Sequence, residues 1–437
     1  TGVLVRCHDD SANLDERMRK LKKGQLQFAV STVDAYLTTG KDHNYPGTIV
    51  AVVDESKGGD AILVRSDKIS SLDDLKIRPV KVALTKDSPS DFFLQAVAVH
   101  FDLDRFKQRG KWLVPADGAD ASLKALQSGK ADVAVLWEPA VSRGLKSSKI
   151  KKLLSTADTQ RLVVDVLLVQ REFLLEQEET VKLLLANYYR TLKYYRSHEE
   201  KLVSDLATAT SLSHKEVRTM LQGVDWQTLY DNDRTWYGIG PQSREDLPST
   251  IDAVMAILQE TRTLQDNPLP DGNPYSIQNK TIIHTLHRQG LSDNDGDDRV
   301  GRKFAQLSAK SWDKLKPVGT LRVRPINFQS GSHQLTSEGE QEMAKIVRNL
   351  SHYPNFRIVI KGHTGLRGDA KANRKLSLAR AEAVKNYLVE KHGLAQTRMR
   401  ALGLGSDEPL PRRDGESQRS YQYRLPRVEL YLVTEVY

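Results

Sequence analysis

Phe356-Arg-Ile-Val-Ile-Lys-Gly-His-Thr364, followed after a short gap by Asn373-Arg-Lys-Leu-Ser-Leu-Ala-Arg-Ala-Glu-Ala-Val384, decides the fold of the C-terminal third of the chain. The first segment has the apolar run and the flanking glycine typical of a strand, which we place at Phe356–Lys361. The second segment belongs to a helix from about Asp369 to His392. Its apolar residues recur at helical spacing. They are Leu376, Ala379, Ala383, Val384, Tyr387 and Leu388.

The neighbouring segments complete a small domain around this strand and helix. We expect a second helix at Ser337–Ser351 and three more strands. The strands are predicted at Leu321–Phe328, near Met399–Leu402 and at Arg427–Val433. The resulting order, β-α-β-α-β-β, predicts an α+β domain of one sheet and two helices over residues 317–437.

This region resembles the OmpA-like domain shared by outer-membrane anchors and MotB-type stator proteins. The resemblance rests on a spaced set of residues rather than on one motif. They are Gly362-His-Thr364, Asn373, Leu376-Ser377, Arg380-Ala381, Gly403-Leu-Gly405 and Arg427-Val-Glu429. The resemblance implies peptidoglycan as a partner.

In that family an aspartate after Gly-His-Thr and the arginine of Arg-Ala hold the zwitterionic end of diaminopimelate. The aspartate pairs with the ammonium group of diaminopimelate, and the arginine pairs with its carboxylate. This chain keeps Arg380 but has Gly365 at the aspartate position. The loss of one charge-assisted contact should cost about 1.5–3 kcal/mol of binding free energy. Asp369 could replace the aspartate if its loop folds back, and Arg380 could instead pair with Glu382 or Glu429. The candidate peptidoglycan-binding residues are Thr364, Asp369, Asn373, Arg380 and Arg427.

Residues 290–301 are polar, acidic and punctuated by glycine, which indicates a linker that we extend over 290–316. Its aspartates resemble part of a calcium loop but lack the closing glutamate. Before the linker, short apolar strands alternate with helices, which predicts an α/β domain with largely parallel sheets. The expected strands are 26–30, 47–53, 61–64, 80–84, 131–136 and 162–169, and the expected helices include 90–101, 120–127 and 176–196.

Three local patterns in this first part carry candidate binding groups. Ser31-Thr32 follows a strand, Asp87-Ser-Pro-Ser-Asp91 opens a helix, and Trp137-Glu138 ends another strand. Hydroxyl groups and free amides at a helix start suit a polar ligand. The Ser-Pro-Ser pattern is equally typical of an ordinary helix cap.

In this order the patterns resemble the type-2 periplasmic solute-binding fold, in its nitrate, sulfonate and taurine branch. The stretch Asp120–Pro139 follows that family's pattern almost position for position. The resemblance implies a two-lobed clamp over residues 1–289 that closes on a small polar or anionic solute. The implied ligand contacts are Thr32, Asp34, Ser88, Ser90, Trp137 and Glu138, with Asp165 as a further candidate. The family normally begins with another strand and helix before the segment that matches Val3–Arg6, so we expect the lobe to lack them.

The chain has 437 residues, 39% of them hydrophobic, and a formal net charge of +9. The charge is uneven. Residues 301–437 hold 25 Lys and Arg against 13 Asp and Glu, whereas residues 1–300 hold 40 against 43. Cys7 is the single cysteine, which excludes internal disulfides and a cysteine-based metal site. It also argues against an enzyme of the pyrimidine-precursor branch of the solute-binding fold, which would need a cysteine-rich iron site.

We expect no catalytic constellation, no metal and no cofactor, and no nucleic-acid partner, because only the charge would favour one. The sequence predicts a non-enzymatic protein of the periplasm or cell envelope of a Gram-negative-type bacterium, membrane-tethered if a further segment exists. It would act as a sensor, an adaptor or a wall-associated binding protein. The alternative is a pair of degenerate domains that serve as interaction surfaces in an envelope protein complex, without solute or specific peptidoglycan recognition.

Overall fold

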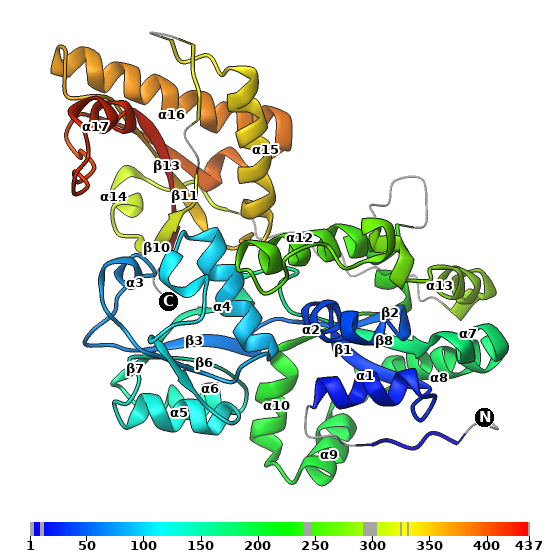
Figure 1. Cartoon of the computed structure of the whole chain (residues 1–437). Helices are drawn as coiled ribbons and strands as arrows, with labels where there is room; N and C mark the ends of the chain where they lie inside the picture. Colours follow the sequence, from blue (N-terminus) through cyan, green and yellow to red (C-terminus); the bar gives the residue numbers. More distant parts are fainter. Residues whose placement is uncertain are drawn as a thin grey trace. The chain divides into compact units, whose positions relative to one another are not determined.

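The structure is a computed structural model of the chain. It describes residues 4–8, 13–238, 246–291, 304–323, 326–329 and 332–435. The chain divides into two compact units (Figure 1). Unit 1 comprises Thr1–Lys68, Val80–Val99 and Arg105–Arg299, and unit 2 comprises Ile69–Pro79, His100–Asp104 and Val300–Tyr437.

The first sheet of unit 1 is antiparallel throughout. Its order is β1 (Phe28–Thr32), β8 (Val164–Gln170), β2 (Gly47–Ser56), β9 (Val224–Trp226). Strand β2 is buried along nearly its whole length because helices contact the sheet. These helices are α1 (Leu14–Lys22), α2 (Val33–Thr39), α7 (Arg171–Glu176) and α13 (Thr281–Leu286).

The second sheet of unit 1 is mixed. Its order is β5 (Leu113–Pro115), β4 (Val82–Leu84), β6 (Val133–Trp137), β3 (Asp60–Arg65), β7 (Ile150–Ser155). Strands β5, β4 and β6 are parallel, whereas β3 runs against both of its neighbours. Helices α5 (Ala119–Gln127) and α6 (Ala140–Gly144) contact this sheet.

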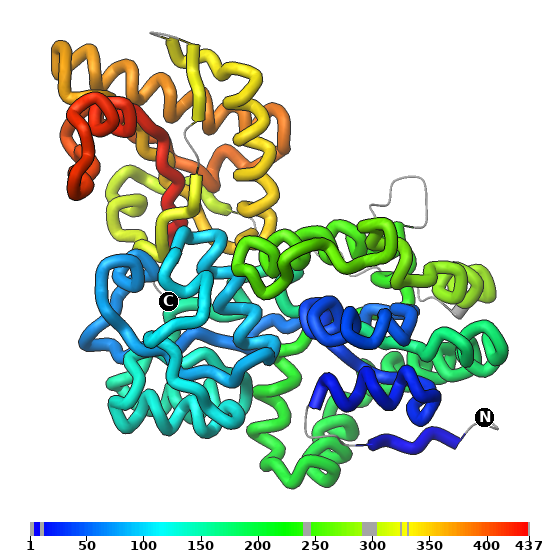
Figure 2. The backbone as a smooth tube through the Cα atoms, in the orientation of Figure 1, coloured from blue at the N-terminus to red at the C-terminus, as the bar shows by residue number. Residues whose placement is uncertain are grey.

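The expected α/β fold with two lobes is confirmed, but the expectation of largely parallel sheets is wrong. The chain leaves the first sheet after β2 and returns to it with β8 (Figure 2). Strand β8 lies between β1 and β2 and is antiparallel to both. Apolar periodicity carries no information on strand direction, which explains the error.

The remaining α-helices of unit 1 lie between residues 89 and 260. They are α4 (Pro89–His100), which extends one residue beyond the unit's boundary, α8 (Glu178–Ser197), α9 (Glu199–Thr210), α10 (His214–Gln222), α11 (Leu229–Asp231) and α12 (Asp246–Glu260). The expected helix at 176–196 is interrupted at Gln177, where α7 ends and α8 begins.

Unit 2 contains one four-stranded sheet in the order β10 (Lys316–Leu321), β13 (Arg427–Thr434), β11 (Arg357–His363), β12 (Met399–Gly405). Only the β11–β12 pair is parallel. Its helices are α3 (Asp74–Ile77), α14 (Ala309–Trp312), α15 (Ser337–Ser351), α16 (Ala370–His392) and α17 (Gln418–Arg424).

The strand expected at Leu321–Phe328 is wrong, because β10 ends at Leu321 and Phe328 forms only an isolated bridge with Leu335. Pro325 interrupts that stretch of sequence, and proline cannot donate a ladder hydrogen bond. The linker expected at 290–316 is described only in part. The aspartates that resemble a calcium loop lie in 292–303, outside the described residues, and 304–316 contain α14 and the start of β10.

Helix α16 lies close against the sheet of unit 2, and its buried face differs from the one expected. The buried side chains are Ser377, Ala381, Val384 and Leu388, so the small residues face inward and Leu376 lies at the border. A Cβ atom at Gly362 would lie 2.0 Å from the carbonyl oxygen of Ser377. Glycine on the strand and serine on the helix thus allow the two backbones to touch. The Ser377 hydroxyl accepts a hydrogen bond from the amide of Gly405 (2.9 Å).

Candidate functional sites

A cavity of about 460 Å³ lies between the two sheets of unit 1. The first sheet contributes Thr32, Asp54 and Asp165 to its lining, and the second contributes Asp60 and Trp137. The loop between β4 and α4 closes one side, with Thr85, Lys86, Asp87 and Ser88 against the cavity. The site is therefore assembled from strand ends and from a helix start, as in many ligand pockets.

The cavity brings together four of the six ligand contacts expected in the clamp. Thr32, Ser88, Trp137 and Glu138 line it, whereas Asp34 and Ser90 do not. Asp34 lies in the first turn of α2 and is 5% exposed. Ser90 is fully buried and donates a hydrogen bond to Asp60 Oδ1 (2.6 Å).

Two of these four lining residues have their polar side chains engaged within the protein. The Ser88 hydroxyl donates to the Thr85 carbonyl (2.8 Å) and accepts from the Asp91 amide (3.3 Å), which is the helix-cap alternative for this motif. The Glu138 carboxylate accepts from the Ser142 amide (3.0 Å) and from its hydroxyl (2.8 Å). These contacts fix the first turns of α4 and α6.

Three carboxyl groups dominate the interior of the cavity. Asp54 and Asp165 are partners across β2 and β8, and their side chains hydrogen-bond to each other. Burial, followed by the charge of Asp165, raises the pKa of Asp54 to about 8. Burial, followed by the charge of Asp60, raises the pKa of Asp165 to about 6. The pair therefore holds a proton near neutral pH.

Asp60 is the third of these carboxyl groups. Its Oδ1 accepts from Ser90 and its Oδ2 accepts from Ser56 (2.9 Å), while burial raises its pKa. Sequence reasoning missed Asp54 and Asp60, although it named Asp165. A signal was available, because each of the three interrupts or begins an otherwise apolar strand.

Where β1 meets α2, Thr32 Oγ1 and Asp34 Oδ1 make no hydrogen bond of good geometry to a described residue. The Thr32 hydroxyl lies close enough to the Asp34 carboxyl group to lower its pKa, but burial outweighs this effect. Both side chains are 5% exposed, and burial raises the pKa of Asp34 to about 7. Of the two residues, only Thr32 lines the cavity.

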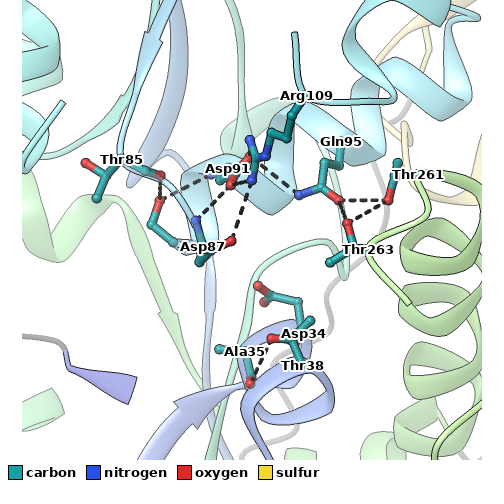
Figure 3. A network of polar contacts seen from close by, with 11 residues as sticks. Asp34, Ala35, Thr38, Thr85, Asp87, Asp91, Gln95, Arg109, Thr261 and Thr263 are labelled. Carbon is teal, nitrogen blue, oxygen red and sulfur yellow. Dashed lines mark hydrogen bonds and ion pairs between the residues drawn. The ribbon is translucent and has the colours of Figure 1, made fainter. Parts of the chain in front are cut away.

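An ion pair between the buried Asp91 and the exposed Arg109 holds the loop between β4 and α4 in place. Asp91, 1% exposed, accepts from Arg109 Nη1 (2.8 Å) and from the Asp87 amide (2.8 Å). Gln95, one turn further along α4, accepts from the hydroxyls of Thr261 (2.8 Å) and Thr263 (2.9 Å). Figure 3 shows this network together with Thr85 and Asp34. It pre-forms the cavity wall that Thr85, Asp87 and Ser88 provide.

In unit 2, Arg380 on α16 has the features of an anion-binding residue. Its Nε donates to the Ser332 carbonyl (3.1 Å), and its guanidinium lies over the Phe328 ring, 5.1 Å from the centroid. It forms no ion pair with any residue that the structure describes, so neither Glu382 nor Glu429 neutralises it. Burial lowers its pKa.

The other candidate residues of unit 2 are occupied by local contacts. Asp369 caps α16, where its Oδ1 accepts from the Ala372 amide (2.8 Å), so it does not replace the missing aspartate. Asn373 Nδ2 donates to the Arg367 carbonyl (3.0 Å), and Arg427 Nε donates to Glu429 (2.7 Å). Thr364 is buried, and its amide donates to Gly405 (2.8 Å). Gly365 lies in open space, where an added Cβ would meet only Gln422, 3.8 Å away.

Residues 327–422, which include Arg380 and Gly365, match the model of the OmpA family. Unit 2 therefore carries an OmpA-family domain. The OmpA domain is 33% identical over 100 residues to outer membrane protein Omp38 of Acinetobacter baumannii, a match that covers 23% of this chain and 28% of Omp38. It is 32% identical over 122 residues to the peptidoglycan-associated lipoprotein of Buchnera aphidicola, with 28% of this chain and 66% of the lipoprotein covered. The chain thus spans just over a quarter of one relative and about two thirds of the other.

Among solved structures, the chain is similar to the periplasmic aliphatic sulphonate binding protein SsuA from Escherichia coli. The identity is 18% and the TM-score 0.45, over 58% of this chain and 81% of SsuA. It is also similar to the desulfurization enzyme DSZB, with 13% identity and a TM-score of 0.42 over 60% of this chain and 85% of DSZB. The first of these proteins is named as a binding protein and the second as an enzyme, and likenesses this low distinguish neither ligand nor activity.

Among the described residues, no helix has both the length and the apolar character needed to cross a membrane. No group of three or more His, Cys, Asp or Glu side chains in this part of the chain is arranged to hold a metal ion.

Proposed function

We propose that this chain is a non-enzymatic protein of the bacterial periplasm or cell envelope that combines a solute-binding clamp with a peptidoglycan-associating OmpA domain. In this proposal the clamp occupies residues 1–289, the linker 290–316 and the OmpA domain 317–437. The cavity between the two sheets of unit 1 supports the clamp. The match to the OmpA family and the relative named as a peptidoglycan-associated lipoprotein support the second part. The protein would act as a sensor, an adaptor or a wall-associated binding protein.

The observation that carries the wall-binding part is the state of Arg380. A half-buried guanidinium without a carboxylate partner among the described residues loses hydration that no local charge restores. A ligand carboxylate would supply the missing partner through paired N–H···O contacts. The stem peptides of peptidoglycan carry such carboxylates.

A peptidoglycan pull-down with purified full-length protein tests this proposal. Arg380→Ala should reduce the fraction retained on insoluble peptidoglycan by about tenfold or more, because a charge-assisted contact is lost. Arg374→Ala is the matched control. It removes the same charge from the same helix, but Arg374 is exposed and pairs with Asp407 (2.8 Å). Equal retention of the wild type and Arg380→Ala would reject a specific site at Arg380.

The second candidate function is a pair of degenerate domains used as protein-interaction surfaces. It is favoured by Gly365, which stands where the family has a ligand-binding aspartate. Its open surroundings leave room for the aspartate of related domains. Under the wall-binding proposal Gly365→Asp should therefore fold normally and raise peptidoglycan affinity by about 10-fold. If neither the wild type nor Gly365→Asp binds peptidoglycan, the interaction-surface function replaces the wall-binding one.

A further inference from the structure

We propose that the cavity of unit 1 binds a small organic cation, a compact amine or quaternary ammonium, and excludes anions. This inference rests on the proposed clamp function and names the class of its solute. It narrows the small polar or anionic solute that the sequence indicated to a cationic one.

The charges around the cavity are the first argument. Asp54, Asp60 and Asp165 face it from three different strands. Neither Asp54 nor Asp165 forms an ion pair with a described residue. An anion would meet carboxyl groups whose negative charge is only partly compensated in a partly desolvated space, whereas an ammonium would find carboxyl oxygens to pair with.

The positive groups of the lining offset these carboxyl groups only in part, because the charge of Arg17 lowers the pKa of Asp165 by less than burial raises it. Arg17 donates from Nη1 to the Val30 carbonyl (2.7 Å), which directs part of its hydrogen-bonding capacity to the main chain. Lys86 is exposed, at the outer part of the loop between β4 and α4. The strand-borne floor of the cavity therefore remains acidic.

A second and independent observation points to a ligand. Thr32 is 5% exposed and lines the cavity, and its hydroxyl makes no hydrogen bond of good geometry within the described ranges, although it lies close enough to the Asp34 carboxyl group to lower the pKa of that group. A buried hydroxyl without a partner costs free energy that a bound polar group would recover. Thr32 is also the β1 partner of Asp165, so its hydroxyl and the acidic pair lie on adjoining strands.

The remaining lining suits an organic cation. Trp137 is half-buried against the cavity and is the cross-strand partner of Asp60, which places an aromatic ring beside a carboxyl group. Aromatic rings attract ammonium groups through their π-face. Val30, Val163 and Met220 provide apolar contacts for the carbon skeleton. A volume of about 460 Å³ is in the range of pockets for small molecules.

The shared proton of the acidic pair links binding to pH. An incoming cation takes the place of the proton between Asp54 and Asp165, so binding should strengthen as pH rises. Other titratable groups act on this pair from neighbouring elements. They are Glu55 on β2, Asp225 on β9, Asp60 on β3, Arg17 on α1 and Tyr188 on α8. Glu55 is paired with Lys57 (2.8 Å).

Isothermal titration calorimetry of the full chain tests the proposal with named probes: putrescine, choline, ethanesulfonate and calcium chloride. Putrescine or choline should bind, and ethanesulfonate should not. The affinity for choline, whose charge is fixed, should rise about 10-fold between pH 5.5 and pH 8. A site that binds calcium but neither amine would overturn the inference.

Variants separate the cavity from the surface. Asp54→Asn should weaken amine binding at least 10-fold and remove most of its pH dependence. Thr32→Val, which leaves every charge in place, should weaken it several-fold. Asp67→Asn is the control, because Asp67 is 60% exposed and pairs with Arg65. Equal amine affinity in the wild type and Asp54→Asn would also overturn the inference.

The failure of this inference differs from the failure of the clamp. If ethanesulfonate binds the wild type and the amines do not, the clamp stands and the cation assignment falls. If no probe binds and none shifts the unfolding temperature, both the cation assignment and the clamp fall. Peptidoglycan retention through Arg380 is measured separately and is unaffected by either result.

Discussion

At the scale of single residues, burial makes the charged form of the carboxyl groups in the cavity of unit 1 unfavourable. Asp54 and Asp165 carry carboxyl groups that hydrogen-bond to each other in a largely desolvated space. An aspartate in an unfolded chain has a pKa near 4. The folded state therefore holds protons that the unfolded state has released. A raised carboxyl pKa makes folding most favourable at low pH and less favourable as pH rises.

We expect the stability of unit 1 to fall between pH 5 and pH 8.5. The contribution of the pair is fully present below about pH 4 and is lost as pH rises through about 6 for Asp165 and about 8 for Asp54. The fall should be on the order of 5 kcal/mol. Thermal unfolding of the wild type and Asp54→Asn across this range measures it. The variant should show a flatter profile, and parallel profiles would contradict the argument.

The same residues explain why the sequence located only part of the site. Thr32, Ser88, Trp137 and Glu138 follow strand ends or open helices, where motif reasoning searches for ligand contacts. Asp54 and Asp60 lie within strands, where a single carboxylate resembles the solvent-facing position of an alternating pattern. Their convergence depends on pairing between strands that are distant in sequence. In unit 2, Arg380 and Gly365 were found because the local motif contains both.

At the scale of elements, apolar runs in unit 1 predicted the strands now seen as β1, β2, β3, β4, β6 and β8. The sequence missed β5 and β9, which have three residues each, and β7, whose two lysines mask its alternation. Long helices were placed well. The inward face of α16 was predicted wrongly. The orientation of this helix depends on contact with glycines of the sheet, and apolar periodicity treats Ser377 as a polar surface residue.

The close approach of α16 to the sheet predicts a sharp difference between two glycines. Gly362→Ala should destabilise the OmpA domain by about 3 kcal/mol or more, because the new Cβ overlaps the Ser377 carbonyl unless the helix moves. Gly365→Ala should change stability by less than about 0.5 kcal/mol, since its surroundings are open. Urea unfolding followed by circular dichroism compares them. Similar losses in both variants would show that α16 is not packed backbone-to-backbone against β11.

At the scale of the whole molecule, the two parts of the chain differ in charge. The excess of Lys and Arg over Asp and Glu is 12 in residues 301–437, whereas residues 1–300 have an excess of three acidic residues. A basic domain is attracted to an anionic polymer over about a Debye length, roughly 10 Å at 0.1 M salt. The cell wall would thus attract the OmpA domain before any specific contact forms. The acidic cavity of unit 1 would at the same time attract cations.

Wall retention should therefore have two components with different salt dependence. Raising NaCl from 50 to 300 mM should weaken peptidoglycan retention of the wild type and of Arg380→Ala together, because both keep the surrounding basic surface. The ratio between the two proteins should change much less, since Arg380 is half-buried and its contact is short-range. Pull-downs of both proteins at four salt concentrations measure this ratio. If the ratio approaches one at 300 mM, Arg380 acts only as one more surface charge, and retention on the wall is electrostatic throughout.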